Sequence, residues 1–190
     1  MKTVFFDVDT QLDFLFPAGA LYAPGAEEIA PALGALTSFA AKSDIQILST
    51  LDSHLENDPE FRSWTPHCVI GTQGQQKYSK TLLERSSSAQ TNFEKNTINF
   101  FANERLHSLL DQLHADHFVV YGLVTEYCVR ATVLGLLERK ARVDLVTDAI
   151  KSFSVAEGCA TLEEVRLRGG RLVTVSDVLN SAYERNHVLP

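Results

Sequence analysis

Cys128 has the sequence setting of a reactive thiol. An apolar run over 117–121 predicts a buried strand, and apolar residues at helical spacing over 131–140 predict a helix. Cys128 is therefore expected at a strand-to-helix turn. Unpaired N–H groups at a helix N-terminus favour a thiolate and are able to receive an oxyanion. The alternative is a small buried hydrophobe, which is the usual role of a free cysteine.

A carboxylate also stands at a predicted strand end. The run 4–8 is rich in Val and Phe and predicts the first strand, which Asp9 follows directly. Ligands bind at the carboxyl ends of strands in parallel α/β sheets, so Asp9 is well placed for chemistry. Turn and capping roles are the alternative, and they are the preferred interpretation for Asp7 and Asp13.

A second group of residues has the composition of a metal site. Asp52 and His54 follow a predicted strand over 45–50, and residues two apart in an extended segment point the same way. With His67 they offer two imidazoles and a carboxylate, a set that binds Zn, Fe or Mn and leaves coordination positions open. Cys68 is left out because successive side chains diverge. Scattered surface residues are the alternative, since Asp-x-His alone is a weak signal.

The elements that would position these groups alternate between strand and helix. Two further strands are predicted over 142–146 and 172–175. Further helices are predicted over 29–39, 103–113 and 154–168. This alternation predicts an α/β fold with a mostly parallel, Rossmann-like central sheet in a three-layer α/β/α arrangement. The long segment 56–72 is expected to be an ordered functional loop, because it contains aromatic, proline and glycine residues.

Length, charge and cysteine content bound the class of protein. The 190 residues fit a single domain over 1–190 that needs no disulfide. A formal net charge of -7 argues against a nucleic-acid partner. Three cysteines without paired spacing suit a reducing compartment. Because no stretch has the pattern of a signal peptide or membrane span, we expect a cytoplasmic protein without membrane contact.

Three separated motifs occur in an order that one enzyme family shares. Residues 9–14 read Asp-Thr-Gln-Leu-Asp-Phe, residues 93–95 read Phe-Glu-Lys, and residues 122–129 read Gly-Leu-Val-Thr-Glu-Tyr-Cys-Val. Together they resemble the isochorismatase-like cysteine hydrolases, most closely the nicotinamidase/pyrazinamidase branch. Segments 52–54 and 64–72 resemble the metal-binding segment of nicotinamidases. The resemblance covers nearly the whole chain and implies the isochorismatase-like hydrolase fold.

The resemblance implies a catalytic triad. Asp9 corresponds to the general base, Lys95 to the catalytic lysine and Cys128 to the nucleophile. By spacing alone, Lys95 would be interpreted as a solvated surface lysine. The family also implies a nonproline cis peptide bond between Leu123 and Val124. That bond would aim the N–H groups of Val124 and Cys128 at the substrate carbonyl oxygen as an oxyanion hole.

The resemblance further implies a divalent metal ion, with Zn expected first and Fe or Mn as alternatives. Its ligands would be Asp52, His54 and His67, and Glu60 is the best-placed residue for a fourth ligand, directly or through water. The implied reaction converts nicotinamide, and pyrazinamide with it, to the carboxylic acid and ammonia through a cysteine thioester. Relatives are often dimers or tetramers, so a homo-oligomer is expected.

The substrate ring is expected to lie between Phe14 and Trp64. One departure from the family concerns the residues after the lysine, where nicotinamidases commonly have Gly and a stretch rich in Asp, Ser, Tyr and Phe. Here residues 96–101 read Asn-Thr-Ile-Asn-Phe-Phe, so Phe100 or Phe101 is expected to supply that wall. Two alternatives stay open: a related cysteine hydrolase for another small carboxamide, and a catalytically silent metal- or ligand-binding protein with this fold.

Overall fold

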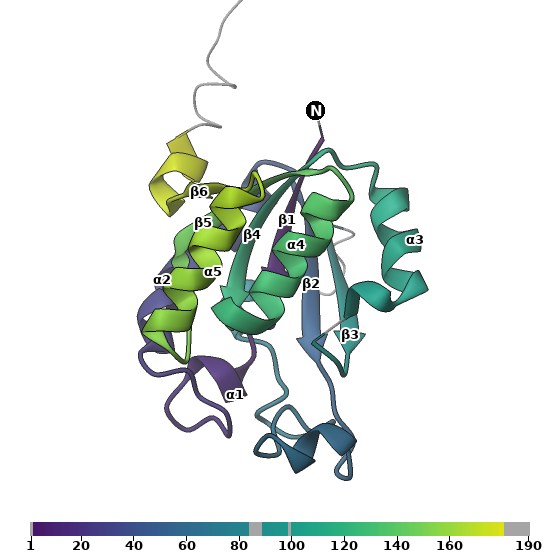
Figure 1. Cartoon of the computed structure of the whole chain (residues 1–190), viewed down its shortest axis with the longest axis vertical. Helices are drawn as coiled ribbons and strands as arrows, with labels where there is room; N and C mark the ends of the chain where they lie inside the picture. The colour runs from purple at the N-terminus through teal and green to yellow at the C-terminus, as the bar shows by residue number, and fades with distance from the viewer. Residues whose placement is uncertain (1, 84–88, 99, 181–190) are drawn as a thin grey trace, which may run out of the picture.

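A parallel sheet forms the centre of the computed structural model, which describes residues 2–83, 89–98 and 100–180. The sheet has six strands in the order β3-β2-β1-β4-β5-β6, and every pair of neighbours is parallel. The strands are β1 (Thr3–Val8), β2 (Gln46–Asp52), β3 (Gln90–Lys95), β4 (His117–Leu123), β5 (Arg142–Lys151) and β6 (Arg171–Val173). The predicted mostly parallel sheet is therefore confirmed. In Figure 1 the strands run downward, so their carboxyl ends point to the bottom of the view.

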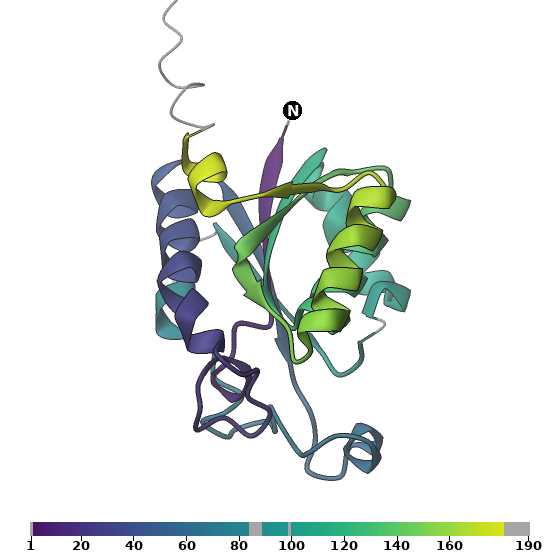
Figure 2. The same cartoon turned by 60° about the vertical axis from the view of Figure 1, so that its left-hand side comes forward.

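Helices cover both faces of this sheet. One face packs against α2 through a buried cluster that includes Phe5 and Tyr121, and the other packs against α3, α4 and α5 through a cluster that includes Phe6 and Val120. Figure 2 shows the sheet between these two layers, which confirms the predicted three-layer architecture. The helices are α1 (Leu12–Leu15), α2 (Ala30–Lys42), α3 (Glu104–Leu113), α4 (Arg130–Glu138) and α5 (Val155–Leu167).

Short helical turns complete the connections, and η2 (Pro59–Arg62) lies in the loop at the lower end of Figure 1. They are η1 (Ala26–Ile29), η2 (Pro59–Arg62), η3 (Ser79–Thr81), η4 (Phe100–Ala102) and η5 (Thr125–Val129). The predicted loop 56–72 contains η2, and all of its residues are described by the structure. Among the described residues, none of the helices is long and apolar enough to cross a membrane.

Among the six strands of the described sheet, β3 is the one that the sequence pattern did not predict. It lies at the edge of the sheet, and its composition is Gln-Thr-Asn-Phe-Glu-Lys. Phe93 and Lys95 are buried in it, whereas Gln90 and Thr91 are half-buried and Asn92 and Glu94 are exposed. An edge strand with a polar exposed surface lacks the apolar alternation by which strands are predicted.

Gly122 is the first residue of the motif 122–129 that contains Cys128, and it allows β4 to approach β1 closely. Its φ is +121°, and an added Cβ would lie 2.0 Å from the carbonyl oxygen of Val8. We expect Gly122→Ala to lower the free energy of unfolding by about 3 kcal/mol or more, measured by denaturant titration. Gly71→Ala is the control, because Gly71 has a φ of +85° but open space around it and should lose only about 1 kcal/mol. Equal losses would show that the collision with β1 does not matter.

Candidate active site

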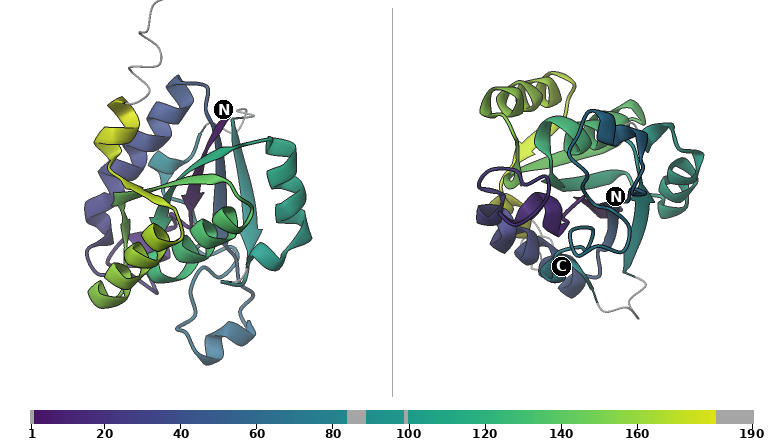
Figure 3. Two further views of the ribbon diagram at one scale, coloured as in Figure 1. Left: turned by 45° about the horizontal axis from the view of Figure 1, so that its top comes forward. Right: turned by 90° about the horizontal axis from the view of Figure 1, so that it is seen from below.

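The residues predicted to do chemistry meet at the carboxyl ends of four neighbouring strands. Asp9 directly follows β1, Asp52 ends β2, Lys95 ends β3, and Cys128 lies in η5 after β4. All four are buried. The strand order reverses direction between β1 and β4, so the site lies at the topological switch point, where open α/β sheets bind ligands. The right-hand view of Figure 3 looks onto this end of the molecule.

The ammonium group of Lys95 connects the predicted triad. Its Nζ lies 2.8 Å from Asp9 Oδ2, 2.8 Å from Asp52 Oδ1 and 3.4 Å from Cys128 Sγ. Burial lowers the pKa of Lys95, but the charges of Asp9, Cys128 and Asp52 outweigh burial and raise that pKa well above its usual value. Lys95 therefore stays charged. Sequence reasoning assigned Asp52 to the metal site alone and missed its contact with this lysine.

The buried position of Cys128 opposes ionisation of its thiol. Burial raises its pKa well above the usual value, and the nearby charge of Lys95 lowers the pKa by less than burial raises it. Asp9 and Asp52 raise the thiol pKa further. The lower pKa expected from a helix N-terminus is therefore not found, because desolvation dominates at a buried site. Asp9 acts on the thiol pKa and shares the ammonium group of Lys95 with it, so Asp9 is the candidate to accept the thiol proton.

The backbone around the nucleophile segment has two unusual features. A cis peptide bond joins Leu123 and Val124, as the resemblance implied. The carbonyl oxygen of Val124 then accepts the N–H groups of Tyr127 at 3.1 Å and Val129 at 3.2 Å, which fixes the η5 turn. Asp9 has a φ of +46°, a left-handed conformation that is uncommon outside glycine and recurs at functional sites.

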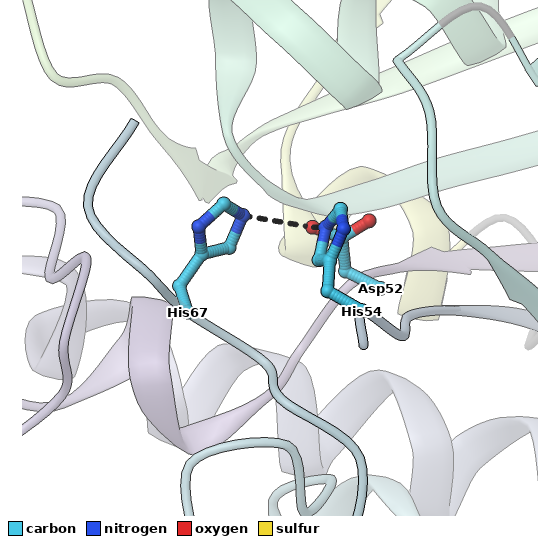
Figure 4. Close-up of side chains that lie close together, drawn as sticks. All are labelled: Asp52, His54 and His67. Atoms are coloured by element: carbon cyan, nitrogen blue, oxygen red, sulfur yellow. Dashed lines mark hydrogen bonds and ion pairs between the residues drawn. The ribbon is translucent and has the colours of Figure 1, made fainter. Parts of the chain in front are cut away.

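Asp52, His54 and His67 converge as the sequence predicted (Figure 4). The Nε2 atoms of His54 and His67 lie 3.0 Å and 3.1 Å from the same atom, Asp52 Oδ2. The Nδ1 atoms face outward: that of His67 donates to the Thr65 carbonyl oxygen at 2.8 Å, and that of His54 lies 3.1 Å from Asp58 Oδ2. Imidazoles that bind a metal through Nε2 are typically held through Nδ1 in this way.

The donor set fits a divalent cation. One ligand atom from each of the three residues lies within 4.8 Å of the other two, and all three residues are buried. Burial lowers the pKa of His54, but hydrogen bonding and charge from Asp52 raise it to about 9, with help from Asp58. The cluster thus favours positive charge between its imidazoles and carboxylate. Glu60 lines the adjacent pocket but is outside this cluster, so its role as a fourth ligand stays a prediction.

A pocket opens beside Cys128 and Asp52. The predicted ring-binding residues Phe14 and Trp64 both line it. Its lining is completed by Leu21, Glu60, His67, Ile98, Val124, Tyr127 and Phe153. The ring of Phe14 lies 5.4 Å from that of His67, so the predicted metal cluster borders the space where a substrate ring would lie.

The wall expected from Phe100 or Phe101 is absent from this lining, and that expectation was wrong. Ile98 is the residue that lines the pocket from this stretch. Phe100 instead turns inward, with its ring centroid 5.6 Å from Lys95 Nζ, and Phe101 packs in the core beside α4. Residue 99 lies outside the described part of the chain. Neither residue reaches the pocket, because Phe100 covers the buried Lys95 and Phe101 packs against the core.

Two residues that line the pocket come from loops without a periodic sequence pattern. Leu21 belongs to the loop after α1, and Phe153 to the turn between β5 and α5. The carboxylate of Glu126 holds that turn by accepting the N–H groups of Phe153 at 2.8 Å and Ser154 at 3.0 Å. Tyr127 also lines the pocket, and its position beside Cys128 in the sequence could have identified it.

Asp13 performs the capping role expected of it. Its Oδ2 accepts the N–H of Cys68 at 2.7 Å, and its Oδ1 accepts the N–H of Ala20 at 2.8 Å. Cys68 has a φ of +46°. Asp13 thereby anchors the segment that carries His67 against the end of β1.

Comparisons with known proteins agree with this geometry. A model described as the Isochorismatase domain matches residues 3–177. The nicotinamidase of Escherichia coli is 25% identical over 90% of this chain and 93% of that protein, and the nicotinamidase/pyrazinamidase of Mycobacterium tuberculosis is 28% identical over 89% and 97%. The crystal structure of Pyrococcus horikoshii pyrazinamidase in complex with zinc has a TM-score of 0.82 and 28% identity, covering 92% of this chain and 99% of that one. The chain belongs to the isochorismatase family.

Proposed function

We propose that this chain is an amidohydrolase that converts nicotinamide, and also pyrazinamide, to the carboxylic acid and ammonia. The observation that carries the proposal is one buried lysine, Lys95, in contact with Asp9, Asp52 and Cys128 beside a pocket lined by aromatic residues. Relatives named for the same substrates, at 25% and 28% identity, support the substrate class.

The first half of the reaction forms a thioester. Asp9 accepts the thiol proton, and Cys128 Sγ attacks the carboxamide carbon. The positive charge of Lys95 offsets the repulsion between the developing thiolate and the carboxylate of Asp9. The N–H groups of Val124 and Cys128 receive the negative oxygen of the tetrahedral intermediate. Asp9 then returns the proton to the amide nitrogen, the C–N bond breaks, and ammonia leaves.

The second half releases the acid. Asp9 accepts a proton from a water molecule, whose oxygen attacks the thioester carbon. The C–S bond breaks, and the thiolate of Cys128 recovers a proton from Asp9. A divalent cation held by Asp52, His54 and His67 would bind the ring nitrogen and so act as a template for the substrate. Phe14 and Trp64 would hold the two sides of the ring.

Ammonia release from nicotinamide and pyrazinamide tests this function. We expect turnover by the purified protein to fall by at least about 100-fold after chelation and to return with Zn²⁺, Fe²⁺ or Mn²⁺. Benzamide is the matched control substrate, because it has the carboxamide but no ring nitrogen. Its slow turnover should not respond to the cation if the cation acts only as a template.

Two negative results of this assay would distinguish the two alternative functions. A protein that carries the cation and a reactive Cys128 but releases no ammonia from nicotinamide would be a hydrolase of another small carboxamide. A protein that forms no acyl-enzyme with any carboxamide would be a silent binding member of the family. We also propose a cytoplasmic location and a homo-oligomer, which fractionation and sedimentation would test.

A further inference from the structure

Gln11 lies where the ends of β1 and β2 separate. It follows Asp9 by two residues and is fully buried. Its N–H donates to the carbonyl oxygen of Asp9 at 2.8 Å. The register between β1 and β2 runs to Asp7 and Ser49, so Gln11 and Asp52 both lie beyond it.

The side-chain amide of Gln11 makes the two hydrogen bonds to the Asp52 backbone that a neighbouring strand would otherwise make. Its Nε2 donates to the Asp52 carbonyl oxygen at 2.8 Å, and its Oε1 accepts the Asp52 N–H at 2.7 Å. The Nε2 group also donates to the carbonyl oxygen of Gln75 at 2.8 Å. On the opposite edge, Asp52 is in register with Lys95 of β3. Asp52 is therefore held on both sides. On one side it pairs with β3, and on the β1 side Gln11 makes the hydrogen bonds to its N–H and to its C=O.

This support matters because Asp52 divides its carboxylate between two tasks. Its Oδ1 lies 2.8 Å from Lys95 Nζ, while its Oδ2 lies 3.0 Å and 3.1 Å from the imidazoles of His54 and His67. An aspartate side chain is short, so the direction of its two oxygens follows the backbone closely. Without the amide of Gln11, the N–H and C=O of Asp52 would lose these hydrogen bonds, which is unfavourable for buried backbone groups.

We propose that Gln11 is a positioning residue that fixes the backbone of Asp52, so that one carboxylate serves both the triad lysine and the cation site. The inference rests on the proposed function only in taking Asp52, His54 and His67 as cation ligands. Gln11 is not itself among the residues that line the pocket, and its hydrogen bonds go to the backbone of Asp9, Asp52 and Gln75. Loss of Gln11 is therefore expected to weaken cation binding and, through the contact between Asp52 and Lys95, to lower turnover as well.

The test compares two amide side chains that make equal numbers of hydrogen bonds. Gln90 begins β3 at the end away from the site; its Nε2 donates to Ser49 Oγ and the Thr81 carbonyl oxygen, both at 2.9 Å, and its Oε1 accepts the Leu83 N–H at 2.8 Å. Both Gln11→Met and Gln90→Met should lower thermal stability. In calorimetric titrations with Zn²⁺ alone, Gln11→Met should raise the dissociation constant by about 10- to 100-fold, while Gln90→Met should stay within about twofold of wild type.

A second variant keeps the test decisive if Gln11→Met does not fold. Gln11→Glu keeps the size of the side chain but replaces the Nε2 donor with an acceptor facing the carbonyl oxygens of Asp52 and Gln75. It should also weaken Zn²⁺ binding and shift the Co²⁺ absorption bands, which report ligand geometry. A wild-type protein that binds no divalent cation, or folded Gln11 variants that bind Zn²⁺ like Gln90→Met, would overturn the inference. Nicotinamide turnover is a separate assay, so its absence would count against the substrate alone.

Discussion

Cys128→Ala should reduce ammonia release from carboxamides by at least about 10⁴-fold, because no other group in the site is able to form the thioester. The sulfur is in contact with Lys95 Nζ at 3.4 Å, so its removal deletes the reacting atom and leaves the charged groups in place. Zn²⁺ binding should be unchanged, since the cation ligands are intact. Initial rates and metal content of the same preparation measure both effects.

A second buried cysteine provides the control. Cys68 is as enclosed as Cys128, and burial raises its thiol pKa as well, but its side chain is outside the pocket lining. Cys68→Ala should lose some stability yet keep kcat within about threefold of wild type. Near-normal turnover by Cys128→Ala would show that the nucleophile lies elsewhere. Mass spectrometry of the wild type during turnover should find the acyl group on Cys128.

Lys95→Met should lower kcat/KM by at least about 10³-fold. The substitution leaves the carboxylates of Asp9 and Asp52 buried together without their shared cation, and it raises the thiol pKa of Cys128 by removing the charge that lowers it. The free energy of unfolding should also fall by about 3 kcal/mol, because breaking a buried ion pair leaves its partner uncompensated. Steady-state kinetics and urea titration measure the two losses separately.

Lys77→Met separates the catalytic loss from the general cost of losing a buried lysine. Lys77 is also buried, and its Nζ lies 2.5 Å from Asp7 and 2.7 Å from Thr10 Oγ1. Its replacement should destabilise the protein to a similar degree, with kcat within about tenfold of wild type in the folded fraction. Equal losses of kcat/KM in the two variants would mean that Lys95 acts only through folding.

The sequence predicted best those features that local patterns determine. The runs 4–8 and 117–121 are mostly apolar, and each became a buried central strand. Asp52 and His54 were predicted to point the same way because an extended chain alternates its side chains, and both contribute to the cluster in Figure 4. Asn103 and Ser154 cap α3 and α5, in agreement with the predicted starts of those helices.

Features that depend on long-range pairing were not predictable from local patterns. Lys95 was identified only through the family resemblance, because β3 is polar and its catalytic environment arises from the register between Asp52 and Lys95. The dual use of the Asp52 carboxylate follows from that same register. Leu21 and Phe153 reach the pocket from loops whose sequences carry no periodic signal, so only the folded chain identifies them.

The edge position of β3 also bears on how this protein would fail on heating. Lys95 is the last residue of an outer strand, whereas Asp9 and Cys128 follow strands in the middle of the sheet. Outer elements with few buried apolar contacts open locally at lower free energy than the core. Detachment of β3 would dismantle the charged centre while the remaining strands stayed folded. Heat inactivation would then be governed by this subglobal opening, and the global melting temperature would overstate the range over which the enzyme works.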